Sequence, residues 1–275
     1  MIRLVCIDVD GTLVGSHGRV HPDVWNAAER ARAAGIRLAI SSGRPAFGIT
    51  REYAARLDAE GWHIFQNGAS VLHLPTGTSR STHIAPETVA MLVHRARARG
   101  DARLLELYTD TEYAFELASP RARAHAELLG VPFQPRPFDS LTGPIVRAQW
   151  VLSHEHAAVV AGESHPGLEV SASTLPVMPD TVFVNMTLAG VDKATAVRLI
   201  ATEYALSLDE VMFVGDGHND ASAMEIVGEP VAMANAEPEV RAIARRFVGH
   251  VDEGGLAEAL DVAITIGPMR GSASH

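Results

Sequence analysis

Cysteine, basic charge and long apolar runs are scarce in this sequence, and each shortage excludes a class of protein. One cysteine, Cys6, leaves no partner for a disulfide bond within the chain. Acidic residues outnumber basic ones by 33 to 23, which argues against nucleic acid or an anionic membrane surface as the main partner. No apolar run approaches the roughly 18 residues that cross a membrane. Because Asp8 leaves no room for a signal peptide, we expect a soluble, cytoplasmic protein.

Both ends of the 275-residue chain alternate short apolar runs with helical patterns. Apolar runs at 2–9, 36–40 and 210–214 each stop at glycine or polar residues, as buried parallel strands do. Residues 21–35 have a helical pattern that starts near a proline and stops at a glycine, and residues 237–246 also favour a helix. This alternation predicts an α/β fold with a Rossmann-like core of three layers, in which helices cover both faces of a parallel sheet.

The middle of the chain has a different pattern. Its apolar segments are longer and some alternate with polar residues, and residues 103–116 resemble a hairpin that turns at 109–111. We therefore expect an inserted α+β domain with an antiparallel sheet. The expected domains are a core at 1–81 and 188–275 and an insertion at 82–187. The tail after residue 266 is expected to be frayed.

Two carboxylates follow the first apolar run directly, in the segment Asp8-Val9-Asp10-Gly11-Thr12. Alternate side chains of a strand share a face, so Asp8 and Asp10 can both project toward one site. Two carboxylates at so short a distance repel each other, which costs free energy unless a cation or a shared proton offsets their charge. The alternative is a plain turn, because Asp-Gly is a common turn dipeptide.

Three further polar segments follow strand ends or open helices. Ser42-Gly43 offers a hydroxyl and backbone N–H groups that can cradle a phosphate, or only cap a helix. Lys193 opens an alanine-rich helix and is either a surface lysine or a fixed positive charge for a phosphoryl oxygen. Asp216 and Asp220, four residues apart, can serve a hard cation, and the alternative is a helix cap. Ligands of open parallel sheets bind beyond the carboxyl ends of the strands, so we expect one common site.

In this order, the four segments resemble the motifs of the haloacid dehalogenase superfamily of aspartate-nucleophile phosphatases. The gap between Asp10 and Ser42 is too short for an inserted domain, whereas the gap between Arg44 and Lys193 is long enough. This arrangement is similar to the Cof-type branch, subfamily IIB, whose large C2-type cap domain lies between the second and third motifs. Asn67-Gly68 and the segment 231–236 resemble further Cof-type patterns. One departure is alanine after Lys193, where that branch often has glycine.

The resemblance implies a phosphatase, a phosphoric monoester hydrolase that depends on Mg²⁺. It implies that Asp8 is the nucleophile that forms an aspartyl-phosphate, and that Asp10 is the general acid and base. The implied magnesium ligands are Asp8, Asp10 through its carbonyl oxygen, Asp216 and Asp220, the last either directly or by orienting the others. The implied phosphate-binding residues are Val9, Ser42, Gly43, Lys193 and Asn219. Thr12 is expected to fix the geometry of the first loop.

The substrate implied by the resemblance is a small phosphorylated metabolite that the cap domain selects. Sugar phosphates are the expected class, with pyridoxal phosphate and flavin mononucleotide left open. Two alternatives share the motifs: a phosphomutase or phosphotransferase that passes the phosphoryl group to an acceptor hydroxyl, and a non-catalytic protein that binds a phosphometabolite. Loss of Asp8, Asp10 or Asp216 would favour the second, and all three are present. We expect a monomer, with a homodimer as the alternative.

Overall fold

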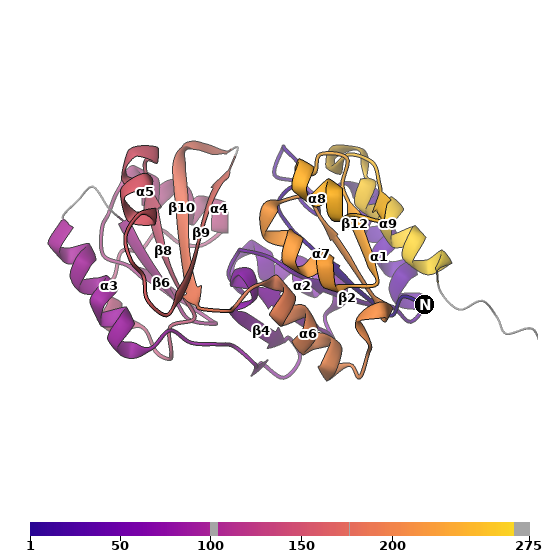
Figure 1. Ribbon diagram of the computed structural model, residues 1–275, viewed down its shortest axis with the longest axis horizontal. Helices are drawn as coiled ribbons and strands as arrows, with labels where there is room; N and C mark the ends of the chain where they lie inside the picture. The colour runs from indigo at the N-terminus through magenta and orange to yellow at the C-terminus, as the bar shows by residue number, and fades with distance from the viewer. Residues whose placement is uncertain (100–103, 176, 267–275) are drawn as a thin grey trace, which may run out of the picture. The chain divides into compact units, whose positions relative to one another are not determined.

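The computed structural model describes residues 1–99, 104–175 and 177–266, and these form two compact units (Figure 1). Unit 1 contains the described residues of Met1–Gly43, Tyr53–Thr78 and Asp192–His275. Unit 2 contains the described residues of Arg44–Glu52 and Ser79–Val191. The tail that we expect to be frayed lies outside the described residues.

Unit 1 is built on a five-stranded sheet in which all neighbouring strands are parallel. In spatial order its strands are β13 (Arg246–Phe247), β12 (Glu229–Ala232), β11 (Val211–Gly215), β1 (Leu4–Ile7) and β2 (Arg37–Ile40). All four residues of β1 are fully buried, as expected for a central strand covered on both faces. A single parallel bridge from Ser41 to Ile64 places β3 beside β2. β3 (Trp62–Phe65) pairs in turn with β4 (Ser70–His73), which is followed by β5 (Thr78–Ser79).

Helices cover both faces of this sheet. On one face α6 (Lys193–Glu203), α7 (Ala221–Ile226) and α8 (Pro238–Ile243) share an apolar cluster with the strands. On the other face α1 (Pro22–Ala33) packs against α9 (Gly255–Thr265). α2 (Ile49–Asp58) lies beside α1, where the Trp25 and Tyr53 rings are 6.4 Å apart. The predicted three-layer α/β core is therefore confirmed (Figure 1).

Unit 2 is built on a five-stranded antiparallel sheet. In spatial order its strands are β7 (Tyr113–Phe115), β6 (Leu104–Tyr108), β8 (Arg147–Leu152), β10 (Met178–Leu188) and β9 (Leu168–Leu175). α3 (Pro86–Arg99) and α5 (His154–Ala161) share an apolar cluster with one face, and α4 (Pro120–Leu129) shares one with the other. The predicted α+β insertion with an antiparallel sheet, including the hairpin of β6 and β7, is confirmed.

The structure differs from the sequence-based expectation in two segments. Residues 44–52, expected in the core domain, group with unit 2 because the Phe47 ring stacks on Tyr108 and Tyr113 at centroid distances of 6.3 and 5.8 Å. The second unit otherwise spans 79–191, against the expected 82–187. The helix expected to reach residue 246 ends at Ile243, because Arg246 and Phe247 pair with β12.

No helix in the described parts of the chain is both long and apolar enough to cross a membrane.

Candidate active site

Two neighbouring strands of unit 1 deliver carboxylates to the same edge of the sheet. Asp8 follows the last residue of β1, and Asp216 follows the last residue of β11. The Asp8 N–H donates to the Val214 carbonyl at 3.0 Å, so the pairing of the two strands continues into the site. One carboxylate oxygen each from Asp8, Asp216 and Asp220 lie within 4.8 Å of one another. The structure thus brings the first and fourth predicted motifs together.

The ammonium group of Lys193 lies inside this cluster. Its Nζ donates to Asp8 Oδ1 and to Asp220 Oδ1, each at 2.6 Å, and the side chain is 0% exposed. Lys193 is the first residue of α6, whose start is fixed because the N-cap residue Asp192 accepts a hydrogen bond from the Thr195 N–H at 2.8 Å. The third motif therefore lies in the same site as the first and the fourth.

Asp220 determines the shape of the loop that follows β11. Its Oδ2 accepts from the N–H groups of Asp216 and Gly217, both at 3.0 Å, while its Oδ1 accepts from Lys193. Asp220 is 0% exposed, so all of these bonds form away from bulk water, where they are strongest. One carboxylate thus orients both the loop that carries Asp216 and the lysine.

Thr12, expected to fix the first loop, and Asn235, for which the sequence predicted no role, both bond to the Asp216 carboxylate. Thr12 Oγ1 donates to Asp216 Oδ1 at 2.9 Å, and Asn235 Nδ2 donates to Asp216 Oδ2 at 3.2 Å. Asn235 Nδ2 also donates to the Gly11 carbonyl at 2.7 Å. Gly11 has a φ of +87°, and a methyl group on it would lie 2.1 Å from Asp216 Oδ2. The first loop therefore fits against Asp216 only with glycine at position 11.

The pKa values of these groups reflect an excess of buried negative charge. Burial, followed by the nearby Asp220, raises the pKa of Asp8 well above its ordinary value, although Lys193 opposes the shift. Burial and Asp220 likewise raise the pKa of Asp216 to about 7. Burial alone would lower the pKa of Lys193, but Asp220 and Asp8 outweigh it and raise the pKa. The lysine is therefore a firmly protonated cation among three carboxylates.

The remaining predicted residues lie around this cluster in unit 1. Ser42 is 0% exposed and its N–H donates to the Ile64 carbonyl at 3.0 Å, which fixes the segment that follows β2. Asn219 Nδ2 donates to Asn67 Oδ1 at 3.0 Å, and Asn67 in turn is bonded to the carbonyl of Ser42. Asp10 lies two residues beyond Asp8 in the loop after β1, and its negative charge is among the smaller causes that raise the pKa of Asp216.

The carboxylates of Asp8, Asp216 and Asp220 are also the group of described side chains suited to a metal ion. Hard divalent cations prefer such oxygen ligands. With Lys193 protonated, the three ionised carboxylates leave a net charge of −2, which equals the charge of one divalent cation in magnitude. The site therefore fits Mg²⁺ in both donor type and charge.

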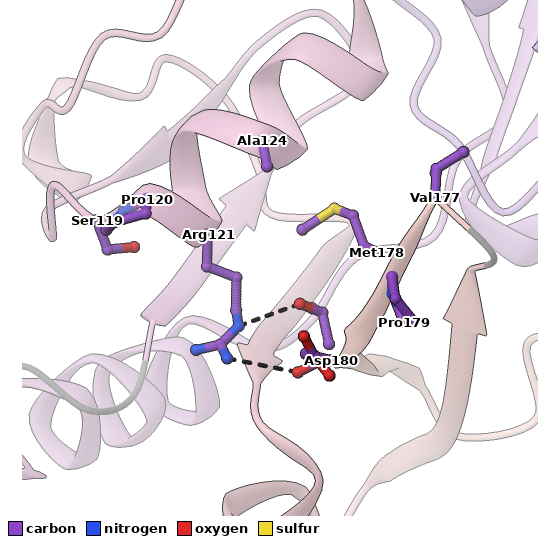
Figure 2. Close-up of a pocket in the computed structure, with 9 residues that line it drawn as sticks. Ser119, Pro120, Arg121, Ala124, Val177, Met178, Pro179 and Asp180 are labelled. Carbon is purple, nitrogen blue, oxygen red and sulfur yellow. Dashed lines mark hydrogen bonds between the residues drawn. The ribbon is translucent and has the colours of Figure 1, made fainter.

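Unit 2 contains an open cavity of about 440 Å³ that includes none of the predicted site residues (Figure 2). It lies between the start of α4 and the start of β10. Arg121 crosses it: Nε donates to Thr181 Oγ1 at 3.1 Å and Nη2 to the Asp180 carbonyl at 3.4 Å. The guanidinium group is thus used within the protein, and the cavity offers no clustered chemical groups comparable to those in unit 1.

The amino-acid composition points to Lys193 independently of the spacing of the motifs. Lys193 is the only lysine in the chain, and the other 22 basic residues are arginines. A compact ammonium can contact two carboxylates from inside a closed site, whereas the planar, larger guanidinium favours bidentate contacts. The single lysine in an arginine-rich chain could therefore have identified this position. No comparable compositional signal identifies Asn67 or Asn235.

Comparisons with known proteins agree with this geometry. A family model described as haloacid dehalogenase-like hydrolase matches residues 5–260. A putative phosphatase of Streptococcus pyogenes is 24% identical over 262 residues, which cover 94% of this chain and 97% of that protein. The putative phosphatase YxeH of Bacillus subtilis is 26% identical over 280 residues, with 94% and 97% covered.

Solved structures show the same fold. A haloacid dehalogenase-like hydrolase from Bacteroides thetaiotaomicron superposes with a TM-score of 0.83 at 24% identity and covers 95% of this chain and 99% of that one. The structure described as the HAD subclass IIB sugar phosphatase BT4131 gives a TM-score of 0.77 at 22% identity, with 94% and 98% covered.

The chain belongs to the haloacid dehalogenase-like hydrolase family, because the family model spans nearly all of it. Within that family it is a Cof-type phosphatase, which confirms the prediction made from the order of the motifs and the position of the insertion.

Proposed function

We propose that the chain is a Mg²⁺-dependent phosphatase that hydrolyses small phosphomonoesters through an aspartyl-phosphate on Asp8. The observation that carries this proposal is the cluster in which the Lys193 ammonium bonds to Asp8 and Asp220 while the Asp216 carboxylate lies beside them. Such an excess of negative charge is costly unless a cation offsets it. Such a site can bind a divalent cation beside a potential nucleophile. This arrangement suits the transfer of a dianionic phosphoryl group.

The proposed magnesium site consists of the carboxylates of Asp8 and Asp216 and the main-chain carbonyl of Asp10. When bound, Mg²⁺ would neutralise charge on the phosphoryl oxygens and so reduce their repulsion from the nucleophile. Both oxygens of Asp220 already accept hydrogen bonds from Lys193 and the loop. This supports a role in which Asp220 orients Lys193 and Asp216 rather than acting mainly as a ligand.

Asp8 and Asp10 are proposed to perform the chemistry in two steps. An Asp8 carboxylate oxygen attacks phosphorus, the bond from phosphorus to the leaving oxygen breaks, and Asp10 donates its proton to that oxygen. Asp10 then accepts a proton from water as the water oxygen attacks the phosphorus of the aspartyl-phosphate. This second step releases inorganic phosphate and restores the Asp8 carboxylate.

The phosphoryl oxygens are proposed to be held by groups from four segments of unit 1. Lys193 supplies a fixed positive charge at Asp8, and Ser42 and Asn219 supply neutral donors. The backbone N–H groups of Val9 and Gly43 are the proposed additional donors. Because these groups are held by the fold before substrate arrives, they need little reorganisation in the transition state.

We propose that unit 2 is the cap domain that selects the leaving group of the substrate, and that unit 1 is the catalytic core. Sugar phosphates are the proposed substrate class. This proposal is supported by the similarity to a structure described as a subclass IIB sugar phosphatase. Other relatives are described as acting on different phosphate esters, such as the phosphoglycolate phosphatase of Methanothermobacter thermautotrophicus. The proposed partner is accordingly a small phosphorylated metabolite.

The test is phosphate release from a panel of sugar phosphates, pyridoxal phosphate and flavin mononucleotide, with Mg²⁺ or with EDTA. We expect release that requires Mg²⁺ and that falls below detection in Asp8→Asn, because an amide is a poor nucleophile. The control is Asp23→Asn, which changes an exposed aspartate and should leave release unchanged. Release that persists in Asp8→Asn or in EDTA would contradict the proposal. Transfer to an acceptor hydroxyl without release would indicate the phosphomutase or phosphotransferase alternative.

A further inference from the structure

The turn between β3 and β4, residues Gln66–Gly68, has an unusual backbone conformation. Gln66, Asn67 and Gly68 have φ values of 54°, 56° and 99°, so three successive residues lie in the left-handed region. Among the described residues, only one other non-glycine residue, Ala205, has a positive φ. Asparagine and glycine tolerate this region, but glutamine does so at a cost in free energy. A strained backbone of this kind persists only where the surrounding structure determines it.

This turn contacts all three segments that carry the proposed phosphate-binding side chains. The Asn67 N–H donates to the Ser42 carbonyl at 2.9 Å. The Asn67 side chain accepts a hydrogen bond from Asn219 at 3.0 Å, which joins residues 152 positions apart. Gly68 lies against Asp192, the residue before Lys193: a methyl group on Gly68 would be 2.1 Å from the Asp192 carbonyl oxygen. Position 68 must therefore be glycine for α6 to begin where it does.

We propose that the Gln66–Gly68 turn is a positioning element for the phosphate-binding half of the site, and that Asn67 is its central residue. This inference rests on the proposed function, because it assumes that Ser42 and Asn219 hold phosphoryl oxygens. Asn67 fixes Ser42 through the main chain and fixes the rotamer of Asn219 through its side chain. Its Oδ1 also lies close to Gly43, since a methyl group on Gly43 would be 3.1 Å from it.

A purely structural explanation is that this turn only closes the hairpin of β3 and β4, which pair from Trp62–His73 to Phe65–Ser70. That explanation accounts for the change in chain direction. It does not account for a side chain that bonds to Asn219 instead of to the hairpin itself. The two explanations predict different results when the side chain is removed and the backbone conformation is kept.

The test is Asn67→Gly, because glycine adopts a φ of 56° without strain while losing the acceptor for Asn219. With saturating Mg²⁺, we expect the inhibition constant of inorganic phosphate and the KM for p-nitrophenyl phosphate to rise about 5- to 10-fold, the effect of one lost hydrogen bond. The melting temperature should change little. In the double variant Asn67→Gly/Asn219→Ala, the rise should be no larger than in Asn219→Ala alone, because Asn67 acts through Asn219.

Two control variants are compared with Asn67→Gly. Asn235→Gly removes an asparagine of the same site that bonds to Asp216 and Gly11, and we expect it to weaken the Mg²⁺ dependence more than phosphate inhibition. Ala205→Gly changes the remaining non-glycine residue of positive φ and should leave both unchanged. A lowered melting temperature in Asn67→Gly with unchanged phosphate inhibition would overturn the proposal and leave the hairpin explanation.

Calorimetry that measures the binding of inorganic phosphate to the protein tests this inference independently of the proposed hydrolysis. If the unaltered protein with Mg²⁺ hydrolyses no ester but binds phosphate, and Asn67→Gly binds it more weakly, the inference stands while the proposed hydrolysis fails. If the two proteins bind phosphate equally, the inference fails even if hydrolysis is confirmed. If the unaltered protein neither binds phosphate nor hydrolyses an ester, both fail.

Discussion

Units 1 and 2 both bury charged side chains, but they balance those charges differently. In unit 1, the ammonium of Lys193 bonds to two of three clustered carboxylates, those of Asp8 and Asp220, and the third belongs to Asp216. In unit 2, buried Glu106 accepts a hydrogen bond from Tyr108 and lies 2.9 Å from His125 Nδ1. The guanidinium of Arg147 lies 4.2 Å from the centroid of the Tyr108 ring in the same cluster.

The cluster in unit 2 contains charges that offset one another. Burial lowers the pKa of Arg147, while Tyr108 and Glu106 act in the opposite direction. Each buried charge therefore has a compensating neighbour, which is what a stable core requires. In unit 1 the carboxylates of the cluster outnumber its one cation, so a bound cation or a proton would relieve their repulsion. The cluster of unit 2, whose charges are compensated, therefore suits a structural role. The cluster of unit 1, which has more carboxylates than cations, suits a chemical one.

Removing the one cation of the unit 1 cluster should produce the largest effect. Lys193→Met keeps the length of the side chain but leaves Asp8 and Asp220 buried without their partner. We expect turnover to fall about 100- to 1000-fold, because a fixed charge at the reacting centre is lost. The free energy of unfolding should fall by about 3–5 kcal/mol, the cost of breaking a buried ion pair. Steady-state kinetics and urea unfolding measure the two effects.

The reference variant is Arg136→Met, which breaks a partly exposed ion pair of unit 2 outside its buried cluster. Arg136 pairs with Glu112 at 2.6 Å, and both side chains are more than a quarter exposed. We expect unfolding to change by less than about 1 kcal/mol, as for other partly exposed pairs, and turnover to stay the same. Comparable losses in the two variants, or normal turnover in Lys193→Met, would contradict the role assigned to the buried cation of unit 1.

Stabilisation by Mg²⁺ should depend on pH through the unit 1 carboxylates. The folded-state pKa of Asp216 is raised from 3.8 to about 7, so without metal its contribution to stability is present at low pH and is lost as pH rises through 7. Mg²⁺ competes with that proton and relieves the charge above pH 7. At a hundredfold excess over its Kd, we expect Mg²⁺ to raise the melting temperature by roughly 5–10 °C at pH 8.

At pH 5 the increase should be much smaller, because protons then occupy the carboxylate. Thermal melts with Mg²⁺ and with EDTA across this range make the measurement. An increase that does not vary with pH would contradict the assignment of the metal to these carboxylates.

The smallest expected effect concerns a compensated pair of unit 2. Hydrogen bonds from Thr142 and Arg136 lower the pKa of Glu112 to about 2. A lowered pKa stabilises the fold above the ordinary range of a glutamate, and this contribution is lost as pH falls through 2. Glu112→Gln should therefore reduce the free energy of unfolding by about 0.5–1 kcal/mol at pH 7 and by almost nothing near pH 2. Urea unfolding at both pH values tests this, and equal losses at both would show that the charge of Glu112 contributes nothing.

The alternating strands and helices of unit 1 could be predicted from the sequence, because its central strands are continuous apolar runs that end in polar residues. The meeting of the four motifs was also predictable, since parallel strands bring their carboxyl ends to one edge. Local pattern could not place residues 44–52 in unit 2, because that depends on Phe47 stacking against a distant hairpin. For the same reason it did not show Arg246 and Phe247 as a strand, where pairing with β12 overrides a helical preference.

Within the site, the sequence predicted residues whose type suits the chemistry and orienting roles for Thr12 and Asp220, but it did not predict the roles of Asn67 and Asn235. Asn67 and Asn235 act through single hydrogen bonds to residues far away in the chain. Asparagine near a glycine or alanine is common in turns, so its type alone carries little information. Such roles follow from three-dimensional contacts that a local pattern does not specify.

The measurement that tests the central claim most directly is acid quenching during turnover, followed by mass analysis of the peptide that contains Asp8. Asp10→Asn with p-nitrophenyl phosphate is the combination to use: this leaving group needs little protonation, so the variant mainly slows the activation of water and the intermediate should accumulate. We predict one added phosphoryl group on Asp8 when Mg²⁺ is present, and none in Asp8→Asn. Phosphate release with no phosphoryl group on Asp8, or with one on another residue, would contradict the account.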